Sequence, residues 1–104
     1  MYARVTTFEG SPEDIEAGVR VYREDVIPWL RDAEGFRGWI VLLDREAGRS
    51  IGLTFWTTEE AARDRDESGA ALRDEVAEAV GASMQSLELY EVVAADELAL
   101  GELR

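Results

Sequence analysis

The chain has 104 residues, 46% of them hydrophobic and 9% aromatic, which fits one globular domain rather than two domains or a disordered chain. Its 23 acidic residues and 11 arginines give a net charge of -12, so nucleic acid and membrane surfaces are poor candidate partners. Histidine, cysteine, lysine and asparagine are absent, which excludes serine–histidine and cysteine–histidine nucleophiles, Schiff-base lysines, thiolate redox pairs and soft-metal cages.

The amino terminus is predicted to be a strand. Residues 2–8 are rich in β-branched and aromatic side chains, and Glu9–Gly10 closes the run. Nothing there resembles a signal peptide, and no apolar run approaches the ~20 residues of a membrane span. We therefore expect a cytoplasmic protein.

A helix is predicted to begin directly afterwards. Ser11 suits the N-cap position, Pro12 suits the first helical residue, and two acidic residues follow at the positive end of the helix dipole. Pro28 is expected to kink or end this helix in its last turn. The apolar residues that recur at helical spacing, and should face the core, are Ile15, Val19, Tyr22, Val26 and Leu30.

A β-hairpin is predicted next. Residues 36–44 form its first strand, residues 45–49 a polar turn that contains Gly48, and residues 50–56 its second strand. Asp44 and Glu46 are interpreted as turn formers.

A second helix follows the hairpin in this prediction. Thr57 or Thr58 caps it, and Thr57 with Glu60 has the spacing of a capping box. Ser68–Gly69 interrupts the helix and Gly81 ends it. Its weaker apolar stripe consists of Ala61, Leu72, Val76, Ala79 and Val80. Residues 83–93 then supply a fourth strand, with Leu87, Leu89 and Tyr90 among its strand formers.

The resulting βαββαβ order predicts a ferredoxin-like α+β sandwich with a four-stranded antiparallel sheet. Residues 39–43 and 53–56 carry large apolar side chains on both faces of the sheet, and two helices can cover only one of them. We therefore expect a homodimer through the open sheet face, which forms a dimeric α+β barrel. Residues 1–104 are one domain with its core in residues 2–93. The tail, residues 94–104, packs on the partner through its leucines or is loose.

Three short segments resemble the antibiotic biosynthesis monooxygenase (ABM) family of the dimeric α+β barrel superfamily. They are residues 51–61 (IGLTFWTTEEA), residues 34–38 (EGFRG) and residues 89–92 (LYEV), and together the pattern spans about residues 2 to 93. The resemblance implies that Trp56 lies beside the substrate. Cofactor-free oxygenases of this family place an asparagine and a tyrosine where this chain has Gly52 and Ala62. Heme-degrading relatives use a histidine, which this chain lacks.

The candidate catalytic residues are Trp56, Tyr22 and Arg4, and each has a structural alternative. Trp56 ends an apolar strand and is more often core or dimer interface than catalytic, and Tyr22 belongs to the apolar stripe of the first helix. Tyr90 has the same ambiguity. Arg4 in an apolar strand either clamps a carboxylate or enolate, or forms an ion pair with Glu88 or Glu91, which we favour.

We predict no bound cofactor and no metal site. The acidic run of residues 64–67 is interpreted as a solvated face, because only Asp64 and Glu67 share a side of a helix and an EF-hand pattern is absent.

Two functions fit these observations. One is a cofactor-independent monooxygenase, or an isomerase-like catalyst, acting on a small aromatic or polyketide-like molecule. The other is a non-catalytic dimeric barrel that binds a small apolar or aromatic ligand or serves as an accessory subunit. A sizeable enclosed pocket bordered by Trp56 and a polar group would favour the enzyme, whereas a filled core would favour the second function.

Overall fold

The computed structural model describes residues 1–64, 74, 78 and 83–96, and the side chains of these residues except 12–15 and 83–85. The elements follow the predicted order, with two strands on either side of the central hairpin turn and helical segments after the first and third strands. They are β1 (Tyr2–Glu9), α1 (Pro12–Val21), η1 (Tyr22–Val26), α2 (Ile27–Arg31), β2 (Phe36–Asp44), β3 (Arg49–Trp56), α3 (Glu59–Asp64) and β4 (Ser83–Glu91).

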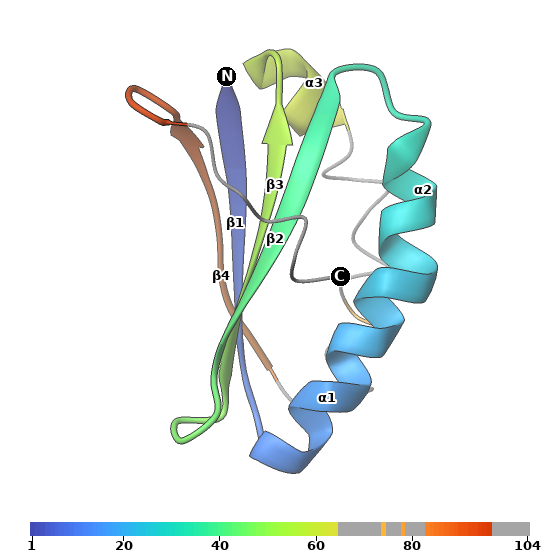
Figure 1. The fold of residues 1–104 in the computed structure, drawn as a ribbon, viewed down its shortest axis with the longest axis vertical. Helices are drawn as coiled ribbons and strands as arrows, with labels where there is room; N and C mark the ends of the chain where they lie inside the picture. Colours follow the sequence, from blue (N-terminus) through green and yellow to red (C-terminus); the bar gives the residue numbers. More distant parts are fainter. Residues whose placement is uncertain (65–73, 75–77, 79–82, 97–104) are drawn as a thin grey trace.

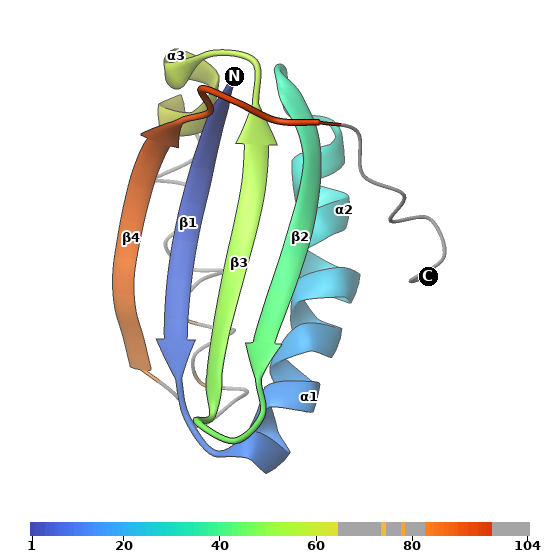
Figure 2. The same ribbon diagram turned by 60° about the vertical axis from the view of Figure 1, so that its left-hand side comes forward.

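The four strands form one antiparallel sheet in the order β2-β3-β1-β4, which confirms the predicted ferredoxin-like α+β fold (Figure 2). The ends of β1 and β3 each extend one residue beyond the prediction. Glu9 pairs with Arg49 across the ladder, and a 2.8 Å ion pair joins their side chains. Strand β4 ends at Glu91, two residues before the predicted Val93. The central elements were therefore predicted more accurately than the strand ends.

The first helix begins at Pro12 as predicted and runs through three segments to Arg31. The irregularity expected at Pro28 takes the form of a π-helical turn, η1, in which the Ile27 N–H donates to the Tyr22 carbonyl. Pro28 has no N–H and cannot donate the usual helical hydrogen bond to the carbonyl of the turn before it, and the wider turn lets the helix continue for three more residues.

The helices α1 and α2 lie along one face of the sheet, and α3 lies beside the end of β3 (Figure 1). Within the predicted stripe, Val26 and Leu30 are buried, whereas Val19 and Tyr22 are half-buried. The side chain of Ile15 lies outside the described residues. Ile27 is 1% exposed although it is not part of the predicted stripe, because the π-helical turn changes the phase of the helix. The core cluster is Phe8, Val26, Ile27, Leu30, Ala33, Trp56 and Ala62.

Thr58 is the residue that caps α3. Its side-chain oxygen accepts a 3.1 Å hydrogen bond from the Ala61 N–H, as an N-cap residue does. The predicted capping box of Thr57 with Glu60 is wrong, and the N-cap lies one residue later. The Thr57 N–H instead donates to the Gly35 carbonyl at 2.9 Å. Most of the predicted apolar stripe, the Ser68–Gly69 break and the Gly81 end lie outside the described residues. In the part of the chain that the structure describes, no helix is long and apolar enough to span a membrane.

The face of the sheet opposite α1 and α2 is largely apolar, as the sequence pattern predicts. Strand register places one set of apolar side chains on this open face: Val5, Ile40, Leu42, Ile51, Leu53 and Phe55. Leu42 is 51% exposed, and Tyr90 at the β4 edge is 50% exposed. Both faces of the sheet therefore carry apolar side chains, and they differ in that α1 and α2 cover only one of them.

Candidate functional site

A small cavity lies between α1 and the helix-facing side of the sheet. Its volume is about 20 Å³, which is room for about one water molecule. Most of the wall is apolar, and the hydroxyl groups of Tyr22 and Ser50 are the polar side-chain groups among the lining residues. These residues are Phe8, Gly18, Val19, Tyr22, Val41, Ser50 and Gly52. As it stands, the cavity accommodates a single small group and not a ring.

Tyr22 forms one wall of the cavity and fills the space above Gly52. A Cβ atom at Gly52 would lie 3.6 Å from the Cε2, Cζ and hydroxyl atoms of Tyr22. The Tyr22 ring also packs against Trp39, with 5.6 Å between the ring centroids and a tilt of 48°. Burial raises the pKa of Tyr22, so its hydroxyl stays protonated near neutral pH and can donate a hydrogen bond. The Tyr22 ring therefore lies over Gly52 at a distance that would be an ordinary van der Waals contact for a Cβ atom.

Trp56 lies at the other end of the helix-facing side and is 2% exposed. Its indole N–H donates a 2.9 Å hydrogen bond to the hydroxyl of Thr54, which is also buried. The ring packs edge to face against Phe36, with 5.4 Å between centroids. Trp56 is not among the residues that line the cavity, so the pocket bordered by Trp56 that would favour an enzyme is not this one.

Arg4 is half-buried on the helix-facing side of β1, directly opposite Thr54 and Leu89. Glu91 extends to the same side, since it pairs with Tyr2, whereas Glu88 pairs with Val5 and extends to the open face. An ion pair between Arg4 and Glu88 is therefore disfavoured by the register. Arg4, like Trp56, is absent from the cavity wall, so Tyr22 is the candidate residue that the structure places there.

The remaining candidates are at the surface. The Tyr90 hydroxyl donates to the Glu88 carboxylate on the open face, and this hydrogen bond raises the pKa of Tyr90. Asp44 accepts a 3.0 Å bond from the Ala47 N–H, which confirms its role in the turn, and Glu46 is exposed. Asp64 is exposed at the end of α3, and the rest of the acidic run lies outside the described residues.

Two residues that contact the Tyr22 ring were not identified from the sequence as parts of the site. Trp39 was treated as a strand residue, yet its ring supports Tyr22. Gly52 was considered only for the side chain that it lacks, yet it is the floor on which the tyrosine ring rests. A glycine inside an otherwise apolar strand is a known signal of close approach by another group, and this signal was present at Gly52.

Comparison with known proteins gives relatives of unknown activity. No protein-family model matches the chain. The uncharacterized protein Rv2558 of Mycobacterium tuberculosis is 39% identical over 77 residues, which are 74% of this chain and 33% of the relative. A second uncharacterized protein of that organism, Rv2557, is 35% identical over 94 residues, which are 90% of this chain and 42% of the relative. The chain thus spans between a third and about two fifths of the length of these relatives.

Comparison with solved structures identifies the fold of the chain. The monooxygenase ActVA-Orf6 of Streptomyces coelicolor, in complex with nanaomycin D, superposes with a TM-score of 0.76 at 18% identity over 94% of this chain and 92% of its own. SnoaB, a cofactor-independent oxygenase from Streptomyces nogalater, has a TM-score of 0.59 at 19% identity, with 94% and 96% of the two chains covered. The chain has the fold of the antibiotic biosynthesis monooxygenases.

The ABM-like fold confirms the resemblance stated from the three sequence segments. A dimeric ferredoxin-like protein from an uncultured marine organism shares it, with a TM-score of 0.65 at 15% identity over 94% of this chain and all of the other. Within the ABM-like fold of this chain, Gly52 supports Tyr22, and Ala62 of α3 is 2% exposed and belongs to the core. Neither position supplies the polar side chain that the resemblance implies.

Proposed function

We propose that the protein is a cofactor-independent monooxygenase acting on a small aromatic or polyketide-like substrate. The observation that carries this proposal is the ABM-like fold, shared along nearly the whole chain with ActVA-Orf6 and SnoaB. The aromatic wall formed by Tyr22 and Trp39 on the helix-facing side of the sheet supports a flat substrate.

The reaction that suits a protein without a resident cofactor uses electrons from the substrate itself. A doubly activated CH₂ group reacts with O₂ to give a carbonyl group and water. One oxygen atom enters the product, and the other leaves as water with the two hydrogens of the carbon. In this proposal the protonated Tyr22 hydroxyl donates a hydrogen bond to the enolate oxygen, and the positive charge of Arg4 stabilises the same anion from β1.

Substrate entry requires movement of Tyr22, because the cavity of about 20 Å³ is smaller than any aromatic ring. Tyr22 begins the π-helical turn, where the backbone is wider than in the α-helix on either side, and its ring rests on Gly52 without a side chain beneath it. Withdrawal of the ring would open an aromatic-sized space against Trp39. Trp56, which lies outside the cavity wall, then acts as a fixed core residue rather than as a reacting group.

The alternative is a non-catalytic barrel that binds a small ligand or serves as an accessory subunit. Three observations favour it. The cavity is water-sized, the Trp56 N–H already donates to Thr54, and Ala62 is packed in the core. In this alternative Tyr22 moves for a ligand that is bound and released unchanged.

Both versions include a homodimer through the open sheet face. The apolar residues of this face would otherwise contact water, and Leu42 on the edge strand β2 is half exposed in the single chain. A second copy offers the same face and can bury both at once around a twofold axis. The dimeric relative with the same fold supports this arrangement.

The activity is tested by following oxygen uptake with a panel of anthrones and quinols. Tyr22→Phe is expected to lower the rate by about 100-fold, because one hydrogen bond to the anionic intermediate is lost. Tyr2→Phe is the matched control, since Tyr2 lies on the same side of the sheet but outside the cavity wall. Oxygen uptake above the buffer rate supports the enzyme. Saturable quenching of tryptophan fluorescence by the same compounds without uptake supports the ligand-binding alternative.

The dimer is tested by light scattering on the wild type and on Leu42→Glu. Two buried carboxylates in an apolar interface should convert the dimer to monomer. Val93→Glu is the control, because Val93 is 85% exposed after the end of β4 and receives the same charge. A wild-type monomer at micromolar concentration would contradict the proposed interface.

A further inference from the structure

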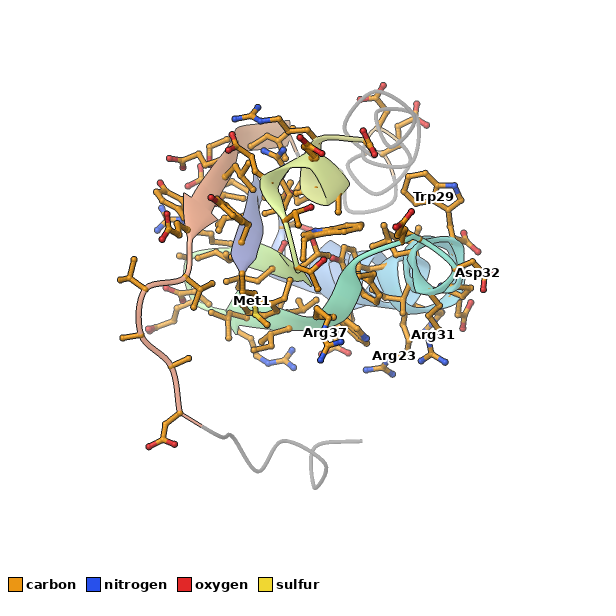
Figure 3. The ribbon with its side chains drawn as sticks, turned by 90° about the horizontal axis from the view of Figure 1, so that it is seen from above. Met1, Arg23, Trp29, Arg31, Asp32 and Arg37 are labelled. Atoms are coloured by element: carbon orange, nitrogen blue, oxygen red, sulfur yellow. The ribbon has the colours of Figure 1, made fainter. Side chains whose placement is uncertain are left out.

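Three exposed arginines from three elements extend to one side of the molecule. Arg23 belongs to η1, Arg31 to α2 and Arg37 to β2. In Figure 3, which looks along the helix, the three side chains extend to the same side of the molecule, whereas Trp29 extends to the opposite side. We call Arg23, Arg31 and Arg37 the arginine row. It is a cationic strip on a chain whose net charge is -12.

The arginine row differs from the arginines that form ion pairs in the structure. Arg45 pairs with Glu16, Arg49 with Glu9 at 2.8 Å, and Arg63 with Glu59 at 2.8 Å. Among the residues that the structure describes, no ion pair involves a member of the row.

The acidic residues nearest in sequence do not neutralise the row. Among the described residues, no ion pair joins a member of the row to Glu24, Asp25 or Glu34. Asp32 follows Arg31 directly, and Figure 3 shows it at the outer edge of the helix rather than beside the row. Its cations are therefore available to carboxylates from outside the chain.

We propose that the arginine row docks an acidic segment of a partner protein. Arg23 and Arg31 are eight residues apart along a continuous helix, which is about 12 Å at 1.5 Å per residue. An extended peptide covers that distance in about four residues at ~3.3 Å each. A segment with acidic residues spaced in this way can engage both guanidinium groups, and Arg37 offers a third site from β2. Planar guanidinium groups bind carboxylates through two parallel hydrogen bonds.

Other occupants fit less well. A nucleic acid carries a phosphate at every nucleotide, so most of its charge would lie beyond the three arginines and face a surface of net charge -12, whereas an acidic segment can place neutral residues there. A small monocarboxylate would hold one exposed arginine, and a single exposed ion pair contributes little to affinity. Several carboxylates on one chain gain from acting together, which is the advantage of an acidic peptide.

The test is fluorescence anisotropy with a labelled peptide of neutral residues that carries glutamates four positions apart, against the same peptide with glutamines in their place. The triple variant Arg23→Gln/Arg31→Gln/Arg37→Gln should weaken binding by at least about tenfold, which corresponds to ~1.4 kcal/mol. The control is Arg45→Gln/Arg49→Gln/Arg63→Gln, which removes the same number of charges from arginines that are already paired. Circular dichroism checks that both variants are folded.

The outcomes separate the proposal from general charge effects. Loss of peptide binding in the triple variant of the arginine row alone supports the docking site. A higher salt concentration should weaken peptide binding by the wild type, since exposed charges are screened. Equal losses of binding in both variants would overturn the proposal, as would equal affinity for the glutamate peptide and the glutamine peptide. Tighter binding of a deca-thymidine oligonucleotide through the row would also overturn it in favour of nucleic acid.

Discussion

The two ends of the helix-facing side of the sheet are built differently. At one end Trp56 is 2% exposed and its N–H is bonded to Thr54, and a Cβ atom on the nearby Gly35 would lie 2.7 Å from Ala61. At the other end a Cβ atom on Gly52 would lie 3.6 Å from Tyr22, beside a cavity of about 20 Å³. The Trp56 end is close-packed, whereas the Gly52 end has room for an added atom.

This difference indicates where the ABM-like fold of this chain can change without unfolding. Packing around Trp56 fixes the position of α3 and of the loop before β2, so a substitution there disturbs several elements at once. Around Gly52 one tyrosine ring supplies the packing, and it can move while the sheet stays in place. Ligand binding is therefore expected at the Gly52 end.

The largest expected effect is at Trp56. Trp56→Ala should lower the free energy of unfolding by about 3–5 kcal/mol, because it leaves a large cavity and an unpaired Thr54 hydroxyl. Trp29→Ala should cost clearly less, since Trp29 is only half-buried at the margin of the core. Urea denaturation of the two variants measures the difference. Equal losses would show that the Trp56 end is not the more tightly packed one.

The next effect concerns Gly35, which has φ of 85°. Gly35→Ala should destabilise by about 1–3 kcal/mol from backbone strain alone. The added Cβ also meets Ala61 at 2.7 Å and the Thr57 hydroxyl at 2.8 Å. Gly38→Ala is the matched control, because Gly38 also has a positive φ but nothing lies within 4 Å of its Cβ position. A smaller loss at Gly35 than at Gly38 would exclude a close contact there.

A pH dependence is expected from Tyr22. Burial raises its pKa above the value of about 10 in the unfolded chain, so folding favours the neutral phenol. This contribution is complete below pH 10 and is lost as the pH rises further, at up to about 1.4 kcal/mol per pH unit. Tyr22→Phe should therefore lose less stability than the wild type between pH 9 and pH 11 in urea denaturation. Parallel curves for the two proteins would place the Tyr22 hydroxyl in water.

The smallest effect is expected at Gly52. Gly52→Ala should leave stability unchanged or raise it by about 0.4–1 kcal/mol, since the Cβ enters an ordinary contact distance and the unfolded chain loses freedom. Thermal unfolding measures this change. A loss comparable to that of Gly35→Ala would remove the contrast between the two ends.

The elements of the fold were predictable because their signals are local. Residues 36–44 were predicted as a strand with the observed ends, and the Ser11–Pro12 signal located the start of α1. Thr57 was preferred for the capping box because spacing alone does not reveal that its N–H is bound to Gly35. The burial of Ile27 was missed because an α-helical period cannot anticipate a π-helical turn.

The candidate site was predicted only in part. Tyr22 was selected from the sequence, and the structure places it in the cavity wall, while Trp56 and Arg4 lie outside that wall. No sequence pattern links Tyr22 to Gly52 and Trp39, because they belong to different elements that meet only when the helix packs on the sheet. The periodicity of apolar residues identifies which side chains face inward, but it does not show which of them contact one another.

By itself the sequence determined the order of strands and helices, the apolar character of both sheet faces and the absence of the common nucleophiles, since periodicity, turn residues and composition are properties of neighbouring positions. Only the tertiary structure decided that Trp56 is sealed in the core, that Tyr22 rests on Gly52 and that three arginines share one side. Those relations depend on distances between elements remote in the chain, which arise when the helix packs against the sheet.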